Sequence, residues 1–102
     1  MDRIAKLKEF MAANPADSFV QHALALEYVK LGDDNEARKI FEGLLRYNEN
    51  YIGSYYHLAK LLERSGQLQE AVQCYEKGMA KARAAGDKHA YNELLAAYDD
   101  LA

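Results

Sequence analysis

The chain has 102 residues, of which half are hydrophobic and 28% are charged, a balance typical of one folded domain. Its formal net charge is −3 and the two signs are interspersed, so the basic patch that marks a nucleic-acid-binding protein is missing from the sequence. No apolar run approaches the roughly 20 residues that a membrane span needs, and charges throughout residues 1–13 do not fit a signal peptide. We therefore expect a cytoplasmic protein without nucleic-acid or membrane partners.

Apolar residues recur at intervals of three and four along six successive segments, which predicts six amphipathic helices. The first segment carries Ile4, Leu7 and Met11 at this spacing, and the last carries Tyr91 and Leu94. The predicted helices cover residues 2–13, 17–31, 34–47, 51–65, 68–85 and 87–101. The sequence thus predicts an all-α fold.

The break between the first two helices follows from proline chemistry. Asn14 precedes Pro15, and a residue before proline disfavours the helical region, so the first helix should end there. Ser18, with Gln21 three residues later, predicts a capping box at the start of the second helix.

Three later breaks contain a glycine at the end of a helix. Gly32, Gly66 and Gly86 each follow an apolar stripe, where glycine readily takes the left-handed conformation of a C-cap. Asp33 and Asp87 come directly after two of these glycines and are good N-cap residues for the next helix. Short helix-to-helix connections are therefore expected, which place consecutive helices antiparallel.

The sequence repeats itself at a period of 34 residues. Phe41 coincides with Tyr75, a conservative match, when the chain is shifted by 34. Identical residues coincide at Leu24/Leu58, Ala25/Ala59, Gly32/Gly66, Glu36/Glu70, Ala37/Ala71 and Glu42/Glu76. A repeat of this length predicts stacked helix pairs, each burying the apolar face of its neighbour.

These residues resemble the tetratricopeptide repeat family, whose pattern is W-x2-L-G-x2-Y followed by A-x3-F. The first repeat matches at Leu24, Tyr28 and Phe41, but Gln21 replaces the leading aromatic residue. The resemblance implies a short α-solenoid of about six helices in one domain, with the last helix as a cap. Its parts are a leading helix at 1–16, repeats at 17–50 and 51–86, and a capping helix at 87–102.

In this family the first helix of each pair lines a concave groove that holds an extended peptide or a partner helix. The resemblance therefore implies a protein-interaction or scaffold module, and Tyr56 is the residue we most expect to contact a ligand. The groove residues carried over by position are Phe19, His22, Leu26, Lys30, Tyr56, His57, Lys60, Arg64, His89 and Asn92. This set has an apolar half and a basic, aromatic half, which suits a segment with an apolar anchor and an acidic group or a C-terminus.

Other interpretations remain open at this point. The groove residues can also be ordinary solvent-facing side chains. The chain can self-associate as a weak homodimer through the ends of the stack, or can be a fragment of a longer repeat protein. The Lys/Asn clamp with which some family members grip a terminal carboxylate is not matched, because His22, Leu26 and His57 stand at its positions.

Catalytic, metal and cofactor sites find no support in the sequence. No serine lies in a G-x-S-x-G motif and no glycine-rich phosphate loop is present. The three histidines occupy different positions in their helices, without the ligand spacing of a metal site. The lone Cys74 is expected to be a small buried side chain rather than a nucleophile. We expect a non-enzymatic protein without cofactors.

Overall fold

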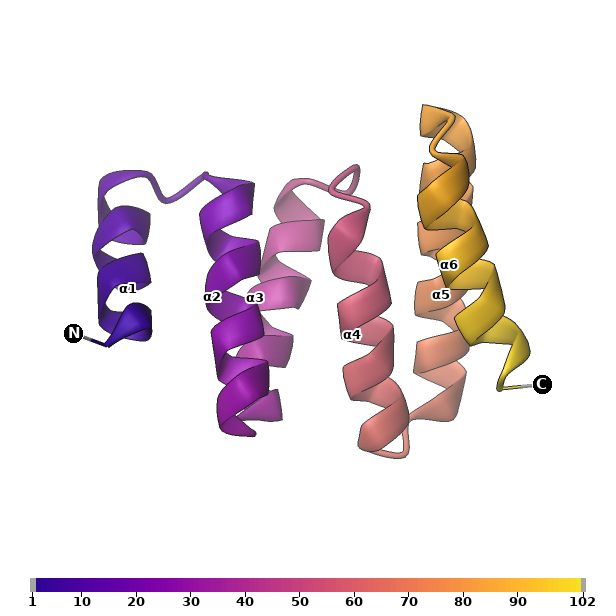
Figure 1. The fold of residues 1–102 in the computed structure, drawn as a ribbon, viewed down its shortest axis with the longest axis horizontal. Helices are drawn as coiled ribbons and strands as arrows, with labels where there is room; N and C mark the ends of the chain where they lie inside the picture. The colour runs from indigo at the N-terminus through magenta and orange to yellow at the C-terminus, as the bar shows by residue number, and fades with distance from the viewer. Residues whose placement is uncertain (1, 102) are drawn as a thin grey trace. The chain divides into compact units, whose positions relative to one another are not determined.

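The structure, a computed structural model, describes residues 2–101 and contains six helices there and no strand (Figure 1). The all-α prediction is confirmed. The helices are α1 (Arg3–Ala13), α2 (Ser18–Leu31), α3 (Asp34–Tyr47), α4 (Gly53–Arg64), α5 (Leu68–Ala85) and α6 (Lys88–Asp99). The chain forms two compact units, one up to Asn48 and one from Glu49 onward.

The first unit contains α1, α2 and α3, with α2 and α3 antiparallel and in contact (Figure 1). Its core includes Phe41 and Leu44, whose exposed fractions are 0% and 1%. Ala25 of α2 and Ala37 of α3 are both 0% exposed. Small side chains at these two positions let the helices approach closely, which explains why the repeat keeps alanine there.

The start of α2 differs from the sequence prediction. The capping box at Ser18 and Gln21 is wrong, because the cap is Asp17, whose carboxylate accepts a hydrogen bond from the Val20 N–H at 3.2 Å. Ser18 is the first helical residue, and its hydroxyl accepts a hydrogen bond from the Asn48 side chain at 3.0 Å. An ionised carboxylate one residue earlier is the stronger acceptor at the positive end of the helix.

The two aspartate N-caps and two of the three glycine C-caps predicted at the later breaks are confirmed. At the third break the C-cap of α4 is Ser65, and Gly66, with φ of 79°, directly follows it. Gly32 and Gly86 end α2 and α5 in the left-handed conformation, with φ of 81° and 71°. The Asp33 carboxylate caps α3, and the Asp87 carboxylate accepts from the Ala90 N–H at 3.0 Å to cap α6. These corners are short because each combines a helix stop with a helix start.

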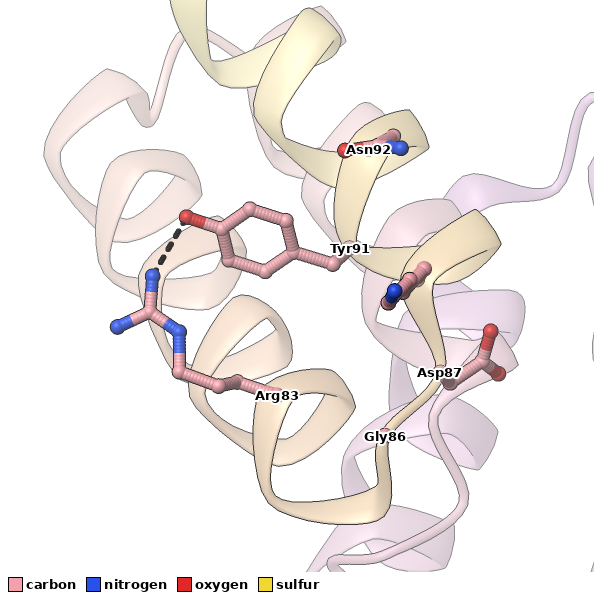
Figure 2. A pocket seen from close by; sticks show the side chains of 6 residues that line it. Arg83, Gly86, Asp87, Tyr91 and Asn92 are labelled. Carbon is pink, nitrogen blue, oxygen red and sulfur yellow. Dashed lines mark hydrogen bonds between the residues drawn. The ribbon is translucent and has the colours of Figure 1, made fainter.

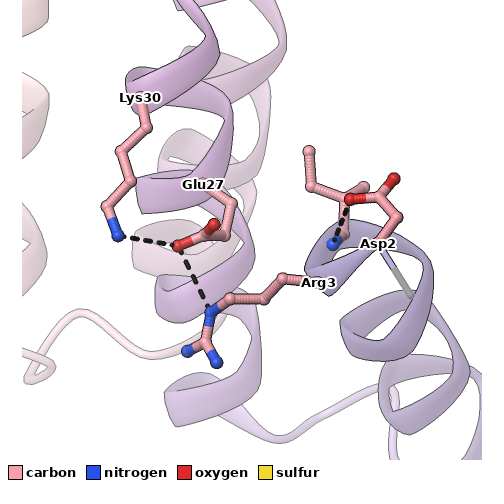
Figure 3. Close-up of polar contacts among 5 residues, drawn as sticks. Asp2, Arg3, Glu27 and Lys30 are labelled. Atoms are coloured by element: carbon pink, nitrogen blue, oxygen red, sulfur yellow. Dashed lines mark hydrogen bonds and ion pairs between the residues drawn. The ribbon is translucent and has the colours of Figure 1, made fainter.

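A carboxylate on α2 holds α1 to the first unit. Glu27 Oε2 lies 3.3 Å from Arg3 Nε of α1 and 3.1 Å from Lys30 Nζ of its own helix (Figure 3). The Glu27 side chain is only 15% exposed, so water screens it less than an open surface carboxylate. Asp2 caps α1 by accepting from the Ile4 N–H at 3.1 Å.

The second unit contains α4, α5 and α6, and α5 packs against both of the other helices. Its core includes Tyr55 and Tyr75, which are 2% and 0% exposed. Gly78 of α5 lies against α4, because a Cβ built on it would come within 2.7 Å of Tyr55 Cβ. Cys74 is half-buried rather than fully buried as the sequence predicted, and its thiol lies 3.4 Å from the Tyr55 carbonyl oxygen of α4.

Candidate functional site

One face of α4 carries an aromatic and basic cluster made of Tyr56, His57 and Lys60. The Tyr56 and His57 rings meet edge to face, with centroids 5.5 Å apart. Lys60 Nζ lies 5.6 Å from the centre of the Tyr56 ring, within the range of a cation–π contact. All three side chains are partly exposed, so the cluster offers ring surface and positive charge together.

A carboxylate from the same helix connects this cluster to the core of the second unit. Glu63 Oε2 lies 3.6 Å from Lys60 Nζ and also accepts a hydrogen bond from the Tyr75 hydroxyl. Burial and the Glu63 carboxylate raise the pKa of Tyr75, which keeps its hydroxyl protonated as the donor. The fixed carboxylate in turn helps to position Lys60 beside Tyr56.

His57 is the titratable member of the cluster. Burial of the imidazole lowers the pKa of His57 below its ordinary value, and the Glu93 carboxylate of α6 opposes this shift. His89 of α6 lies 4.0 Å from the same Glu93 carboxylate, and its side chain is 92% exposed. The predicted groove residues His57 of α4 and His89 of α6 therefore both interact with the Glu93 carboxylate.

The predicted groove residues of the first unit all lie on α2 and differ in how open they are. Phe19 is 71% exposed, although an apolar ring of this size is usually buried. His22 is half-buried and its ring meets Phe41 edge to face at 5.6 Å, so part of it contacts the core. Leu26 is half-buried, and Lys30 is exposed but paired with Glu27.

Sequence reasoning missed a pocket of about 300 Å³ at the corner between α5 and α6 (Figure 2). Arg83 and Tyr91 form one wall: the Arg83 Nη2 donates to the Tyr91 hydroxyl at 2.7 Å, and the guanidinium lies 5.0 Å from the ring centre. Asn92, predicted as a groove residue, lines this pocket. The remaining lining residues are Gly86, Asp87 and Lys88.

A signal for this pocket was present in the sequence. Gly86 and Asp87 predicted the corner, and Arg83 lies three residues before it and Tyr91 four residues after it. Arg83 has no role in the sequence prediction, and Tyr91 appears there only in the apolar stripe of the last helix. Their contact depends on the angle between the two helices, which periodicity does not give.

The sequence model of the tetratricopeptide repeat family matches residues 28–98, more than two thirds of the chain. The chain belongs to the tetratricopeptide repeat family. A tetratricopeptide-repeat-containing protein of Pseudomonas aeruginosa is 26% identical over 91 residues, covering 89% of this chain and 87% of that protein. The resemblance inferred from the 34-residue period is thereby confirmed.

Solved structures agree with the family. A tetratricopeptide repeat domain protein of Salinibacter ruber, seen in a crystal, is 35% identical with a TM-score of 0.81, covering 83% of this chain and 94% of that one. The solution structure of a Salinibacter ruber tetratricopeptide repeat domain gives 35% identity and a TM-score of 0.82, covering 86% and 89%. A Bordetella parapertussis protein shares the fold alone, with 22% identity and a TM-score of 0.85 over 99% and 88%.

Tetratricopeptide repeats are in general protein-interaction modules and typically lack catalytic activity, and this chain has their fold. Within residues 2–101, no three histidine, cysteine or acidic side chains are grouped so that they could hold a metal ion. None of the helices described is both long and apolar enough to cross a membrane.

Proposed function

We propose that this tetratricopeptide repeat chain binds a peptide segment or a partner helix through the exposed face of the first helix of each helix pair. These first helices are α2 in the first unit and α4 with α6 in the second. The observation that carries the proposal is the cluster of Tyr56, His57 and Lys60, in which two rings and a cation are held together outside the core. Tyrosine is among the residues that dominate the energetics of protein interfaces.

The charge of the α4 face favours a segment with an acidic group. Its ionised side chains are Lys60, Glu63 and Arg64, two positive and one negative, which leaves +1. Glu63 already accepts from the Tyr75 hydroxyl, so it offsets the Lys60 charge only in part. A carboxylate on the partner would gain from both cations, and its carbon chain could lie on the Tyr56 ring.

The exposed phenylalanine of α2 gives the first unit a contact point for an apolar anchor. Phe19 is 71% exposed, and burying an apolar side chain of this size stabilises a complex by roughly 1.5–3 kcal/mol. Leu26, half-buried on the same helix two turns later, would extend the apolar contact.

Selection of peptides from a random display library, followed by fluorescence anisotropy on the selected sequence, tests the proposal. Tyr56→Ala and Lys60→Glu should each weaken binding by about tenfold or more, as expected for central contact residues. Helical content and thermal midpoint should stay close to those of the unsubstituted chain, because both side chains lie outside the core.

Matched controls come from α3, the second helix of its helix pair. Tyr47 is 72% exposed and the Lys39 side chain is 76% exposed, so Tyr47→Ala and Lys39→Glu remove the same chemistry from another face. Their affinities should equal that of the unsubstituted chain. Equal binding by Tyr56→Ala, Lys60→Glu and the controls would show that the groove assignment is wrong.

Self-association is the second candidate, and the exposed aromatic residue of α1 favours it. Phe10 is 51% exposed on a helix whose Leu7 is buried, so α1 leaves an apolar residue open to a second copy. Light scattering should then give a dimer mass that falls on dilution, and Phe10→Ser should abolish the dimer. A constant monomer mass across micromolar concentrations would exclude this candidate.

A further inference from the structure

The pocket at the α5–α6 corner has its own charge character. Arg83 and Lys88 contribute two cations and Asp87 one carboxylate, so its lining carries +1. The Asp87 carboxylate is engaged by the Ala90 N–H at 3.0 Å and points away from Arg83 and Tyr91 (Figure 2). Among the ion pairs formed by residues 2–101, neither Arg83 nor Lys88 takes part.

Arg83 is already held in a geometry that suits an anion. Its Nη2 donates to the Tyr91 hydroxyl at 2.7 Å, which fixes the guanidinium plane while leaving its other N–H groups available. Pre-organisation of this kind lowers the entropy cost of a two-point contact with a carboxylate. Asn92, on the same lining, can donate to or accept from a peptide bond.

The size of the pocket limits what can occupy it. About 300 Å³ lies at the lower end of ligand pockets, which run from roughly 300 to 1,000 Å³. The space therefore suits one side chain rather than a folded segment. The Tyr91 ring and the aliphatic stem of Arg83 add apolar surface beside the cations.

We propose that this pocket binds the side-chain carboxylate of an acidic residue in a partner polypeptide, with an apolar neighbour of that residue against Tyr91. The carboxylate would meet Arg83 and Lys88, and Asn92 would contact the partner backbone. This site lies at the α5–α6 corner and uses none of the α4 cluster residues. The pocket and the groove can therefore be tested independently.

Amide NMR titration of the full chain with doubly capped octapeptides tests the proposal. The probe acetyl-Gly-Ser-Ala-Phe-Glu-Ala-Ser-Gly-amide carries one carboxylate and no charged end. It should shift the amide signals of Gly86, Lys88 and Asn92, and the matched peptide with Gln in place of Glu should bind about tenfold more weakly. Equal affinity of the two peptides, or shifts that leave these amides unchanged, would overturn the proposal.

A third peptide separates a side-chain carboxylate from a chain end. It carries Gln in place of Glu and a free C-terminal carboxylate, and it should bind as weakly as the capped Gln peptide. If it binds as tightly as the Glu peptide, the pocket takes chain ends and the assignment to an acidic side chain is wrong.

Lys88→Glu gives the protein-side test without a folding complication. Lys88 is exposed in the first turn of α6, where a carboxylate favours the helix dipole, so the variant should fold at least as well as the original. Binding of the Glu peptide should fall at least tenfold, and a peptide with Lys in place of Glu should gain affinity for the variant. Lys39→Glu, with the same change in net charge on α3, should bind the Glu peptide normally; an equal loss in both variants would contradict a specific site.

Discussion

Gly78→Ala should destabilise the second unit, although alanine is ordinarily the better helix former. A Cβ at position 78 would lie 2.7 Å from Tyr55 Cβ and 3.1 Å from Leu94 Cδ1. Tyr55 cannot easily move aside, because it is 2% exposed and its hydroxyl donates to the Glu49 carbonyl at 2.6 Å. The closest atom is a Cβ fixed to the backbone of α4, so relief requires the helices to separate.

Two opposing terms set the magnitude. Replacing glycine by alanine inside a helix gains about 1 kcal/mol from backbone entropy. Overpacking a closely packed core costs about 1–3 kcal/mol, and a contact as short as 2.7 Å belongs at the upper end of that range. We therefore expect Gly78→Ala to lower the free energy of unfolding by about 1–2 kcal/mol.

Gly43→Ala is the matched control. Gly43 also lies inside a helix, α3, but a Cβ built on it meets none of the atoms described within 4 Å. It should gain about 0.5–1 kcal/mol. Urea unfolding followed by circular dichroism would measure both variants against the original chain. Gly78→Ala with a stability equal to or above that of the original would refute the close approach of α4 and α5.

Three further substitutions test the cap of α6, the titration of His57 and the attachment of α1. Asp87→Ala removes the cap of α6, whose carboxylate accepts from the Ala90 N–H at 3.0 Å, and should cost about 1 kcal/mol in urea unfolding; an unchanged midpoint would contradict the cap. His57 has a folded-state pKa below its ordinary 6.5, so as the pH falls through 6.5 the unfolded chain takes the proton first and stability is lost. His57→Gln should flatten the dependence of unfolding free energy on pH between about 7 and 5. An unchanged slope would mean that another group causes this pH dependence. Glu27→Gln should speed amide exchange in α1 while sparing α3, because it weakens the contact to Arg3, whose side chain is 64% exposed, so that the ion pair contributes only about 1 kcal/mol; unchanged exchange would mean that packing alone holds α1.

Local chemistry explains why the helix ends were predictable. Gly32 and Gly86 take positive φ, and Asp33 and Asp87 cap the following helices, all within a few residues of each other in the chain. The error at Ser18 has a local cause too, because both Asp17 and Ser18 are good caps and the motif with Gln21 favoured the wrong one.

Packing geometry explains what could not be predicted. Gly78 has no feature in the sequence that separates it from Gly43, and only the approach of Tyr55 makes it necessary. The contact between Arg83 and Tyr91 similarly depends on how α5 and α6 cross. Periodicity assigns a residue to a face of its own helix, but not to a partner on the next.

The candidate groove was predictable only in part. The family pattern placed Tyr56, His57 and Lys60 on α4, and the i,i+4 spacing alone brings Lys60 to the Tyr56 ring. The edge-to-face contact of Tyr56 with its chain neighbour His57 depends on side-chain conformation and does not follow from the spacing. Glu63 follows Lys60 by three residues on α4, a spacing that indicates their ion pair. The hydrogen bond that Tyr75 of α5 donates to Glu63 depends on helix packing, and no spacing rule indicates it.

Mapping the surface that a bound peptide contacts tests the central proposal most directly. Amide NMR spectra of the full chain would be recorded with a library-selected peptide at saturation. We predict that the largest shifts fall on α4, centred on Tyr56 and Lys60, with further shifts on α2 and α6. Shifts confined to α3 and α5 would contradict the assignment of the binding face to α4.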